Sequence, residues 1–334
     1  MTASDTVLLG TTGVRLSRLV MGTMGFGHDA EADAAVYRAC RDAGVFVFDG
    51  ADVYGKGAAE EALGRLVAGH RDEVVITSKA YFPMGAGPND RGSSRYHLVR
   101  AVEASLRRLG TDRIDVFFLH RFDDDTDPSD TLRAVENLWV QGKITYVGLS
   151  NFAAWQAQQA LGLAAVHGFA PAVAVQPMYN LVKRQAEAEI LPMAAANRLA
   201  VLPYSPLGGG LLTGKYGRAD RPARGRLVDN AMYATRYGAA DNYEVAERFR
   251  AYAAERGVHP VTLAIAWVAS HPAVTAPLVG ARNLEQLGPA LAALELQLSA
   301  EERAAISALS TAPPPATDRN EEGSGHDYAS RLTR

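Results

Sequence analysis

The sequence has a single cysteine among its 334 residues, Cys40, so an internal disulfide is impossible. Its formal net charge is only −3 at pH 7, which excludes the basic surface typical of nucleic-acid-binding proteins. No apolar run approaches the roughly 20 residues needed to cross a membrane. The opening stretch, MTASDTVLLG, lacks the basic and long apolar segments of a signal peptide. These absences predict a soluble, cytoplasmic protein that binds neither nucleic acid nor membrane.

Apolar residues make up 48% of the sequence, enough to form a large core. No polar linker or charge run divides the chain before about residue 311, so we predict one domain over residues 1–310. Residues 311–334 contain the run Pro313–Pro315 and few apolar side chains. They are predicted to form a C-terminal tail that is either flexible or caps the active site.

Short apolar runs alternate with helical patterns along most of the chain. Runs without polar alternation are typical of parallel strands that are covered on both faces. Eight such strands with intervening helices predict an α/β protein of the (β/α)8 TIM-barrel type. The predicted core strands are Arg18–Gly22, Val45–Phe48, Val74–Thr77, Ile114–Leu119, Ile144–Leu149, Ala172–Val175, Ala200–Pro203 and Thr275–Val279.

Two segments fall outside this repeat. Val7–Gly10 and Val14–Leu16 predict an N-terminal β-hairpin that would plug an open barrel end. The interval between Tyr204 and Thr275 is too long for one crossover, so it is predicted to be an insertion before the eighth strand. Long insertions of this kind usually form lids or binding loops. The predicted helices of the repeat and the insertion are Glu31–Ala43, Ala58–Ala68, Ser94–Leu109, Pro128–Gln141, Ala153–Val166, Ala186–Asn197, Tyr243–Arg256, Val261–Ser270 and Asn283–Leu294.

Polar side chains and tight turns follow the apolar runs at the points where the strands end. The C-terminal ends of parallel barrel strands form one face, so these residues are expected to gather in a ring around an active site. The ring consists of Asp49, Lys79, His120, Ser150, Asn151, Gln176, Tyr204, Ser205, Gly280, Ala281 and Arg282, and Tyr54 lies five residues beyond Asp49.

Four of these residues carry the groups that reduction of a carbonyl needs. A phenol with a pKa of about 10 transfers no proton at neutral pH unless a neighbour stabilises its anion. An ammonium within about 4–6 Å lowers a phenol pKa, so we expect Lys79, held by Asp49, to tune Tyr54. His120 is expected to donate a hydrogen bond to the substrate carbonyl oxygen. Each residue also has a purely structural interpretation, as a helix cap, a surface charge or a buried histidine with local partners.

Two nucleotide-binding motifs are not supported. Gly209–Lys215 fits the spacing GxxxxGK, but Tyr216 stands where a P-loop has Ser or Thr for magnesium. No GxGxxG follows the first strand, so a Rossmann site has no basis. The backbone amides of Leu207–Leu211 are nevertheless suited to a pyrophosphate.

The sequence resembles the aldo-keto reductases from about Val7 to Leu309. The matching motifs, in order, are MGTMGFG, FDGADVYGKGAAEEALG, VVITSK, DVFFLHR, GKITYVGLSNF, VQPMYN, PYSPLGGGLLTGK and LVGARNLEQL. The resemblance implies a barrel that binds extended NADP(H) across its C-terminal face and reversibly reduces aldehydes or ketones. It places the family's catalytic tetrad on Asp49, Tyr54, Lys79 and His120, with Tyr54 as general acid and base.

The resemblance also implies the cofactor contacts. The nicotinamide carboxamide would be bound by Ser150, Asn151 and Gln176, and Tyr204 would stack on the nicotinamide ring. NADPH is predicted, with NADH as a weaker alternative, because a guanidinium such as Arg282 pairs well with the 2′-phosphate. The full predicted set is Gly22, Thr23, Met24, Asp49, Ser150, Asn151, Gln176, Tyr204, Ser205, Pro206, Leu207, Gly209, Leu211, Lys215, Gly280, Arg282 and Gln286.

One departure from the family concerns the adenine. Pro289 and Ala290 stand where the family commonly has a Glu and an Asn that contact the adenine, so adenine contacts and affinity are left open. The predicted substrate pocket for a small carbonyl or alcohol is mostly apolar, with Arg121 as a candidate anchor for an anionic substrate. Its residues are Met24, Phe26, Tyr54, Tyr81, Phe82, His120, Arg121, Phe122 and Met178. No metal site is predicted.

Two rival functions are weighed against carbonyl reduction. Family members that resemble potassium-channel β subunits bind NADPH tightly and act mainly as regulatory partners, so a regulatory protein with slow turnover is the alternative. A Schiff-base aldolase that uses Lys79 is less favoured, because it leaves Ser150, Gln176 and Arg282 without a purpose.

Overall fold

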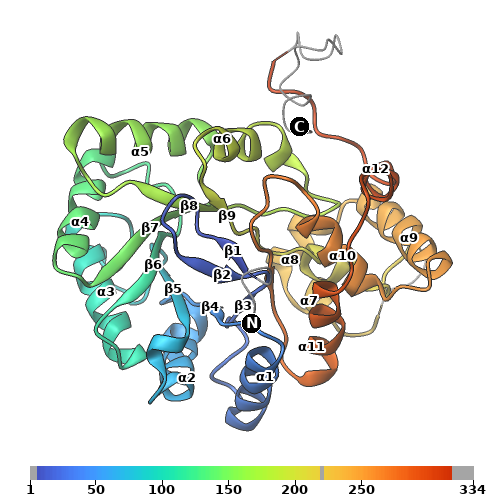
Figure 1. The fold of residues 1–334 in the computed structure, drawn as a ribbon, viewed down its shortest axis with the longest axis horizontal. Coiled ribbons are helices and arrows are strands. Elements are labelled where there is room, and N and C mark those ends of the chain that lie inside the picture. The colour runs from blue at the N-terminus through green and yellow to red at the C-terminus, as the bar shows by residue number, and fades with distance from the viewer. Residues whose placement is uncertain (1–5, 219–221, 318–334) are drawn as a thin grey trace.

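Eight parallel strands form the central sheet of the computed structural model, which describes residues 6–218 and 222–317 (Figure 1). The strands are β3 Val20–Gly22, β4 Val47–Asp49, β5 Val75–Ala80, β6 Ile114–Leu119, β7 Ile144–Ser150, β8 Ala172–Gln176, β9 Ala200–Val201 and β10 Leu278–Val279. They lie in the order β10, β3, β4, β5, β6, β7, β8, β9, so most sequence neighbours are also neighbours in space.

Backbone hydrogen bonds close this sheet between its first and last strands. The amides of Thr275 and Ala276 donate to the carbonyl oxygen of Val201 at 2.9 and 3.3 Å. The amide of Leu278 donates to Pro203 O at 2.8 Å. The sheet therefore curls on itself, and the predicted (β/α)8 barrel is confirmed.

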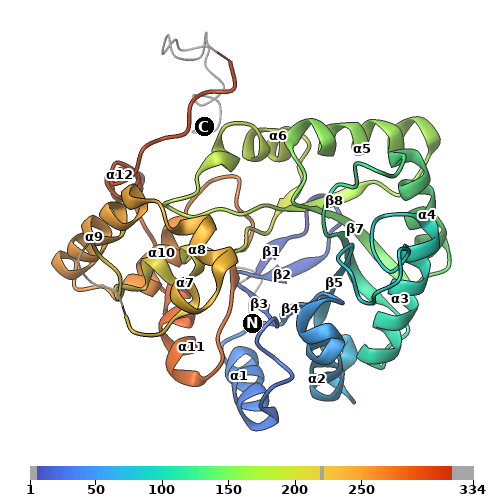
Figure 2. The ribbon, with the colours of Figure 1, turned by 180° about the vertical axis from the view of Figure 1, so that it is seen from behind.

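Helices surround the sheet, with α1 to α6 along one part of the periphery and α7 to α12 along another (Figures 1 and 2). Their bounds are α1 Ala30–Asp42, α2 Ala58–Val67, α3 Arg95–Leu109, α4 Pro128–Val140, α5 Ala154–His167, α6 Ile190–Ala196, α7 Arg226–Asp229, α8 Ala231–Tyr237, α9 Ala240–Glu255, α10 Pro260–Ala269, α11 Leu284–Leu291 and α12 Ala300–Ser307. Short 3₁₀ segments are η2 Tyr54–Gly57, η3 Arg71–Glu73, η4 Gln185–Glu187, η5 Gly208–Thr213 and η6 Ala292–Leu294. None of the helices within the described residues is long and apolar enough to span a membrane.

Local sequence signals explain where several helices begin. Asp29 precedes α1, and its carboxylate accepts hydrogen bonds from the amides of Glu31 and Ala32, both at 3.1 Å. Asp127 caps α4 in the same way, with Pro128 at the first helical position. Such residues satisfy amides that have no partner inside the helix, and proline has no amide to satisfy.

The N-terminal hairpin pairs β1 Thr6–Leu8 with β2 Arg15–Ser17 in antiparallel register. Leu9 and Leu16 are fully buried and pack in one cluster with side chains from the early parts of the barrel strands, including Val20 and Val47. The predicted hairpin is therefore confirmed, and it fills the end of the barrel where the strands begin.

Several predicted boundaries need correction. The strand predicted at Val45–Phe48 begins at Val47, because the amide of Val45 donates to Cys40 O (2.8 Å) at the end of α1. The helix predicted at Ala186–Asn197 is the short turn η4 followed by α6, which has Pro192 in its first turn. The first core strand likewise starts two residues after Arg18.

The insertion before β10 contains two helices, α7 and α8, that the sequence analysis did not predict. Both precede the predicted helices α9 and α10. Residues 219–221 of the insertion lie outside the described residues. The described part of the predicted C-terminal tail, residues 311–317, has neither helix nor strand, and residues 318–334 lie outside the described range. The domain boundary at residue 310 stays a prediction.

The inside of the barrel is packed with side chains, and one glycine is essential to that packing. A Cβ atom at Gly148 on β7 would lie 2.3 Å from Cε1 of Phe118 on β6. Phe118 is fully buried, so its ring has no free space into which to move. The missing side chain of Gly148 therefore provides the volume that the phenyl ring occupies.

We expect Gly148→Ala to lower the free energy of unfolding by about 1–3 kcal/mol, because it overpacks the barrel interior. Gly162 on α5 provides the matched control, since nothing lies within 4 Å of its added Cβ. Gly162→Ala should stabilise the protein by about 0.5–1 kcal/mol through helix propensity. Urea denaturation of the two variants tests both signs, and a neutral Gly148→Ala would contradict the packing argument.

Candidate active site

The C-terminal ends of β4 and β5 bring Asp49 and Lys79 together inside the barrel. Lys79 Nζ lies 2.6 Å from Asp49 Oδ2 and also donates to Gly50 O at 2.7 Å. The other carboxylate oxygen of Asp49 accepts hydrogen bonds from Thr77 Oγ1 (2.6 Å) and Gln176 Nε2 (2.9 Å). Lys79 has no exposed surface, and Asp49 has almost none. Two buried charges are tolerated here because each is paired and further hydrogen-bonded.

Tyr54 lies beside this pair at the start of η2. Lys79 Nζ is 5.2 Å from the centre of the Tyr54 ring, and the ring itself is half-buried. The turn that follows has left-handed backbone at Gly55, Lys56 and Gly57, with φ values of 57°, 53° and 98°. Two glycines make this conformation accessible, and Lys56 adopts it at some cost in strain.

His120 follows β6 and packs edge-on against two aromatic rings. Its ring centroid is 6.1 Å from that of Tyr54 and 4.8 Å from that of Phe82. Burial, and then the positive charge of Lys79, hold the pKa of His120 well below its usual range. The imidazole is therefore neutral at pH 7. Its buried Nδ1 has no hydrogen-bond partner among the described residues. A structural role based on local hydrogen bonds therefore does not explain why a histidine is buried here.

The electrostatics of Tyr54 differ from the prediction. Burial, and then the negative charge of Asp49, hold the pKa of the phenol well above its usual value, with Tyr233 and Asp52 acting in the same direction. Lys79 does not lower the phenol pKa as expected, because its charge is largely compensated by Asp49. The pKa of Lys79 is itself lowered by burial, against the opposing effect of Asp49.

The residues predicted to hold the nicotinamide are joined by hydrogen bonds across neighbouring strand ends. Ser150 Oγ donates to Gln176 O (3.1 Å), and Asn151 Nδ2 donates to Ser150 Oγ (3.2 Å) and to His120 O (2.9 Å). The Tyr204 hydroxyl donates to Asn151 Oδ1 at 2.7 Å. The structure thus brings these predicted residues together beside Asp49, which accepts from the Gln176 amide.

The predicted pyrophosphate segment, Ser205–Leu211, is a loop with left-handed backbone at Gly208, Gly209 and Gly210. Asn180 Nδ2 holds its start by donating to Ser205 O at 2.9 Å. A Cβ at Gly209 would lie 2.8 Å from the ring of Tyr233 and 2.9 Å from that of Tyr237, so α8 packs directly against this loop. The side chain of Leu211 is buried, which leaves only its backbone for a ligand, whereas Lys215 is exposed.

The predicted adenosine end follows β10. Arg282 is exposed, and its Cγ is 3.5 Å from where a Cβ of Gly25 would lie, so this residue packs over the β3–α1 loop. Its amide donates to Gln286 Oε1 at 3.1 Å. Ala290 is buried and Pro289 half-buried, which fits the expected lack of polar adenine contacts from these positions.

Comparison with known proteins extends this picture. The Aldo/keto reductase family model matches residues 18–311. The chain belongs to the aldo/keto reductase family. This confirms the resemblance predicted from the sequence motifs.

Individual relatives cover most of the chain. The uncharacterized oxidoreductase YrpG of Bacillus subtilis (strain 168) is 36% identical over 307 residues, which is 88% of this chain and 92% of the relative. A probable voltage-gated potassium channel subunit beta of Oryza sativa subsp. japonica is 37% identical over 297 residues, 86% and 90% of the two chains. The L-glyceraldehyde 3-phosphate reductase of Escherichia coli O157:H7 is 34% identical over 318 residues, 89% and 90%. Membership of this aldo/keto reductase family, with relatives named as oxidoreductases, supports an oxidoreductase.

The residues predicted for the substrate pocket of this reductase fold are not all equally placed. Phe26 is 1% exposed and belongs to the core behind the site, so it lines no open surface. Phe122 packs against Phe152 and Trp155, with ring centroids 5.5 and 5.7 Å away. Met178 Sδ accepts a hydrogen bond from the Tyr237 hydroxyl at 3.3 Å. Exposed or half-buried members of the set are Met24, Tyr54, Tyr81, Phe82, Arg121, Phe122 and Met178, and His120 is nearly buried among them.

Sequence reasoning missed three kinds of residue at this site. Thr77 supports Asp49, and the signal was available, because Thr77 and Lys79 alternate along β5 and so share a face. Tyr233 and Tyr237 lie on an unpredicted helix and gave no signal. Asp52 lies between Asp49 and Tyr54 in the sequence and was passed over, although it is fully buried.

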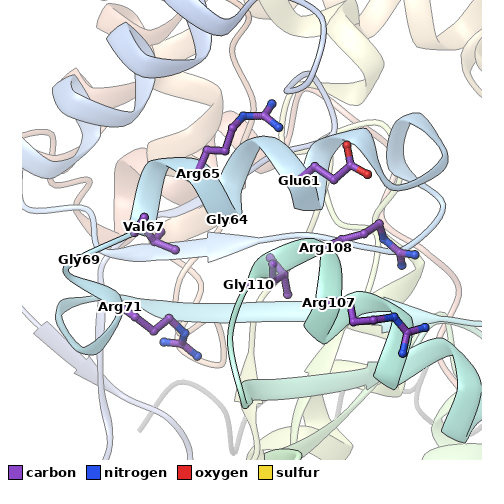
Figure 3. Close-up of a pocket in the computed structure, with 11 residues that line it drawn as sticks. Glu61, Gly64, Arg65, Val67, Gly69, Arg71, Arg107, Arg108 and Gly110 are labelled. Carbon is purple, nitrogen blue, oxygen red and sulfur yellow. The ribbon is translucent and has the colours of Figure 1, made fainter.

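A cavity of about 670 Å³ lies away from these residues, between α2 and α3 (Figure 3). It contains none of the predicted site residues. Two of its arginines already have partners, since Arg71 lies 2.8 Å from Asp115 and Arg108 lies 2.7 Å from Glu60. The cavity is a groove between outer helices and is separate from the candidate active site.

Removal of the Lys79 charge should expose how much the fold depends on the ion pair. Lys79→Met leaves the Asp49 carboxylate buried beside an apolar side chain, and we expect a loss of about 3–5 kcal/mol in the free energy of unfolding. The double variant Asp49→Asn/Lys79→Met should recover part of that loss. Urea denaturation of the two single variants and the double variant forms the cycle. Equal stabilities for Lys79→Met and the double variant would contradict a buried, mutually compensating pair.

Proposed function

We propose that this family member is an NADPH-dependent carbonyl reductase that converts aldehydes or ketones reversibly to alcohols. The observation that carries the proposal is the convergence of a phenol, a buried ion pair and a neutral imidazole at the ends of β4, β5 and β6. In support, Tyr54 lies beside the Lys79 ammonium and edge-on to His120. Family membership and relatives named as reductases support a small-molecule carbonyl substrate. The predicted cytoplasmic location stays a prediction.

The residues present fit the cofactor that the family implies. The amides of Asn151 and Gln176 and the hydroxyl of Ser150 form the linked donors and acceptors that a carboxamide requires. Residues 208–210 are all glycine, so no side chain of their own covers the backbone of this loop. NADPH, when bound, supplies the hydride. Lys215 and Arg282 are exposed cations near that loop and at the expected adenosine end.

Tyr54 is the proposed general acid. A phenol whose pKa lies well above its usual value is protonated throughout the neutral range, as reduction requires. As the proton leaves, negative charge develops on the phenol oxygen. The Lys79 ammonium near the ring stabilises that charge only in part, because Asp49 compensates most of its own charge. The neutral His120 imidazole orients the carbonyl oxygen by donating a hydrogen bond.

A regulatory role is the alternative. The observation that favours it is the likeness to relatives named as probable potassium channel β subunits, at 37% and 35% identity. Such a protein would bind NADPH and turn over slowly. Multiple-turnover assays over a panel of aldehydes, ketones and sugars distinguish the two, because a regulatory protein stays near a single turnover with every substrate.

Tyr54→Phe tests the reductase directly. It removes the transferable proton but leaves the ring in place, so we expect carbonyl reduction to fall by about 10²–10⁴-fold with little change in NADPH affinity. Cofactor oxidation followed by absorbance measures the first quantity, and fluorescence titration of NADPH measures the second. Unchanged turnover in the variant would remove Tyr54 from the mechanism.

Arg282→Ala tests the choice of cofactor. If the guanidinium pairs with the 2′-phosphate, NADPH binding should weaken by about ten- to hundredfold, equivalent to roughly 1.5–3 kcal/mol. NADH lacks that phosphate and is the internal control, so its affinity should barely change. Equal losses for both cofactors would show that Arg282 does not distinguish them.

A further inference from the structure

Asp52 is a buried carboxyl group that the mechanism above does not use. It lies in the loop between β4 and η2 and has no exposed surface. Its backbone amide donates to Lys79 O at 3.1 Å, which fixes it beside the ion pair. Neither side-chain oxygen has a hydrogen-bond partner among the described residues, although the amide of Val53 is near enough to lower its pKa.

A second buried carboxylate, on α2, acts on Asp52 through its charge. Glu60 is 1% exposed, and its two oxygens are both satisfied. Oε1 accepts from Ser78 Oγ at 2.5 Å, and Oε2 accepts from Arg108 Nε at 2.7 Å. Arg108 comes from α3, where it also lines the groove shown in Figure 3, so it lies on the solvent side of Glu60. The charge of Glu60 is therefore compensated.

A count of charges around Asp52 shows that its own charge has no such compensation. The ionisable groups that act on it are Glu60 from α2, Arg108 from α3 and Lys79 from β5. Arg108 is paired with Glu60, and Lys79 is paired with Asp49. Three buried carboxyl groups thus face two cations. An ionised Asp52 would be a buried charge without a partner, which is strongly unfavourable.

We propose that Asp52 is a positioning residue that carries a proton while Tyr54 acts, so that this third carboxyl group adds no negative charge beside the phenol. Burial, and then the charge of Glu60, raise the pKa of Asp52 to about 7, in agreement with this geometry. Asp52 also acts on Tyr54 and Lys79, since its negative charge raises the pKa of each. Ionisation of Asp52 therefore opposes the negative charge that forms on Tyr54 during proton transfer.

This consequence for the reaction rests on the proposed function. Above about pH 7, an ionised Asp52 makes Tyr54 a weaker acid and slows proton donation to the carbonyl oxygen. The protonation of Asp52 is independent of that function. It can be detected in how the free energy of unfolding varies with pH. The unfolded chain releases this proton near pH 4, whereas the folded protein keeps it until about pH 7. Stability must therefore fall as pH rises between these values and then level off.

Asp52→Asn is the informative variant, because the amide has the shape of the protonated acid and cannot ionise. The ratio of kcat/KM for carbonyl reduction, variant over parent, should be about 1 near pH 6. It should rise to about three- to tenfold near pH 8.5, since the increase in the phenol pKa caused by an ionised Asp52 is transmitted in part to the rate. A ratio that is reduced equally at every pH would mean that Asp52 is only structural and would overturn the proposal.

Glu61→Gln is the matched control. Glu61 neighbours Glu60 on α2 but is exposed, so removal of its charge should leave the pH dependence of the rate unchanged. Thermal melting gives a readout that needs no activity. The melting temperature of Asp52→Asn relative to the parent should increase between about pH 4 and pH 7 and stay constant above. A difference that does not change with pH would overturn the proton on Asp52, whereas an active Tyr54→Phe would overturn the proposed function alone.

A direct titration keeps the proposal testable if Asp52→Asn does not fold. In parent protein labelled with [¹³C]aspartate, one aspartate carboxyl should titrate near neutral pH in NMR spectra. Glu60→Gln removes the adjacent like charge and should move that midpoint to lower pH, which identifies the carboxyl as Asp52. Titration of every aspartate below about pH 5, or a midpoint unmoved by Glu60→Gln, would refute the assignment.

Discussion

The Asp49–Lys79 ion pair is the interaction on which the rest of the site depends. It joins β4 to β5 through a 2.6 Å contact between Lys79 Nζ and Asp49 Oδ2, both buried. The remaining hydrogen bonds of the two side chains reach Gly50, Thr77 and Gln176. The contacts with Gly50 and Gln176 fix the ends of β4 and β8 relative to the pair, and Thr77 adds a second contact from β5. A buried pair of this kind adds little to net stability but tolerates only one arrangement of its neighbours. It therefore acts mainly as a geometric constraint on the strand ends beside Tyr54.

The same pair explains why the pKa of the Tyr54 phenol is raised, although a neighbouring lysine alone would lower it. Lys79 alone would favour the phenolate, but a lysine whose charge is compensated at 2.6 Å contributes little field at Tyr54. The surroundings then consist of apolar burial and carboxylates, which favour the neutral phenol. Pairwise reasoning on residue types cannot anticipate this result, because the sign depends on the third group.

Sequence patterns predicted the parts of this molecule that follow from periodicity. Unalternated apolar runs marked the eight barrel strands, and the polar residue after each run marked Asp49, Lys79 and His120 as members of one face. Strand ends follow less directly from the sequence. Val45 has a side chain typical of a strand, but its amide donates a hydrogen bond to Cys40 O at the end of α1. Such choices depend on backbone hydrogen bonds that side-chain type does not encode.

Features that depend on how outer helices pack against distant segments could not be predicted. The environment of Asp52 needs Glu60 from one helix and Arg108 from the next, 48 residues beyond Glu60. The packing of Tyr233 on Gly209 likewise requires an insertion helix whose sequence shows no strong pattern. The family resemblance implied roles for residues in the shared motifs. It implied none for the carboxyl group of Asp52.

The hairpin at the start of the barrel has a consequence for how molecules travel to and from the chemistry. Leu9 and Leu16 close the end of the barrel where the strands begin, so a ligand can reach the reactive groups only from the end where the strands finish. Anything that reaches Tyr54 enters and departs by the same opening. If a cofactor and a substrate use the same opening, they must bind and leave one after the other. The ligand that lies deeper then leaves last.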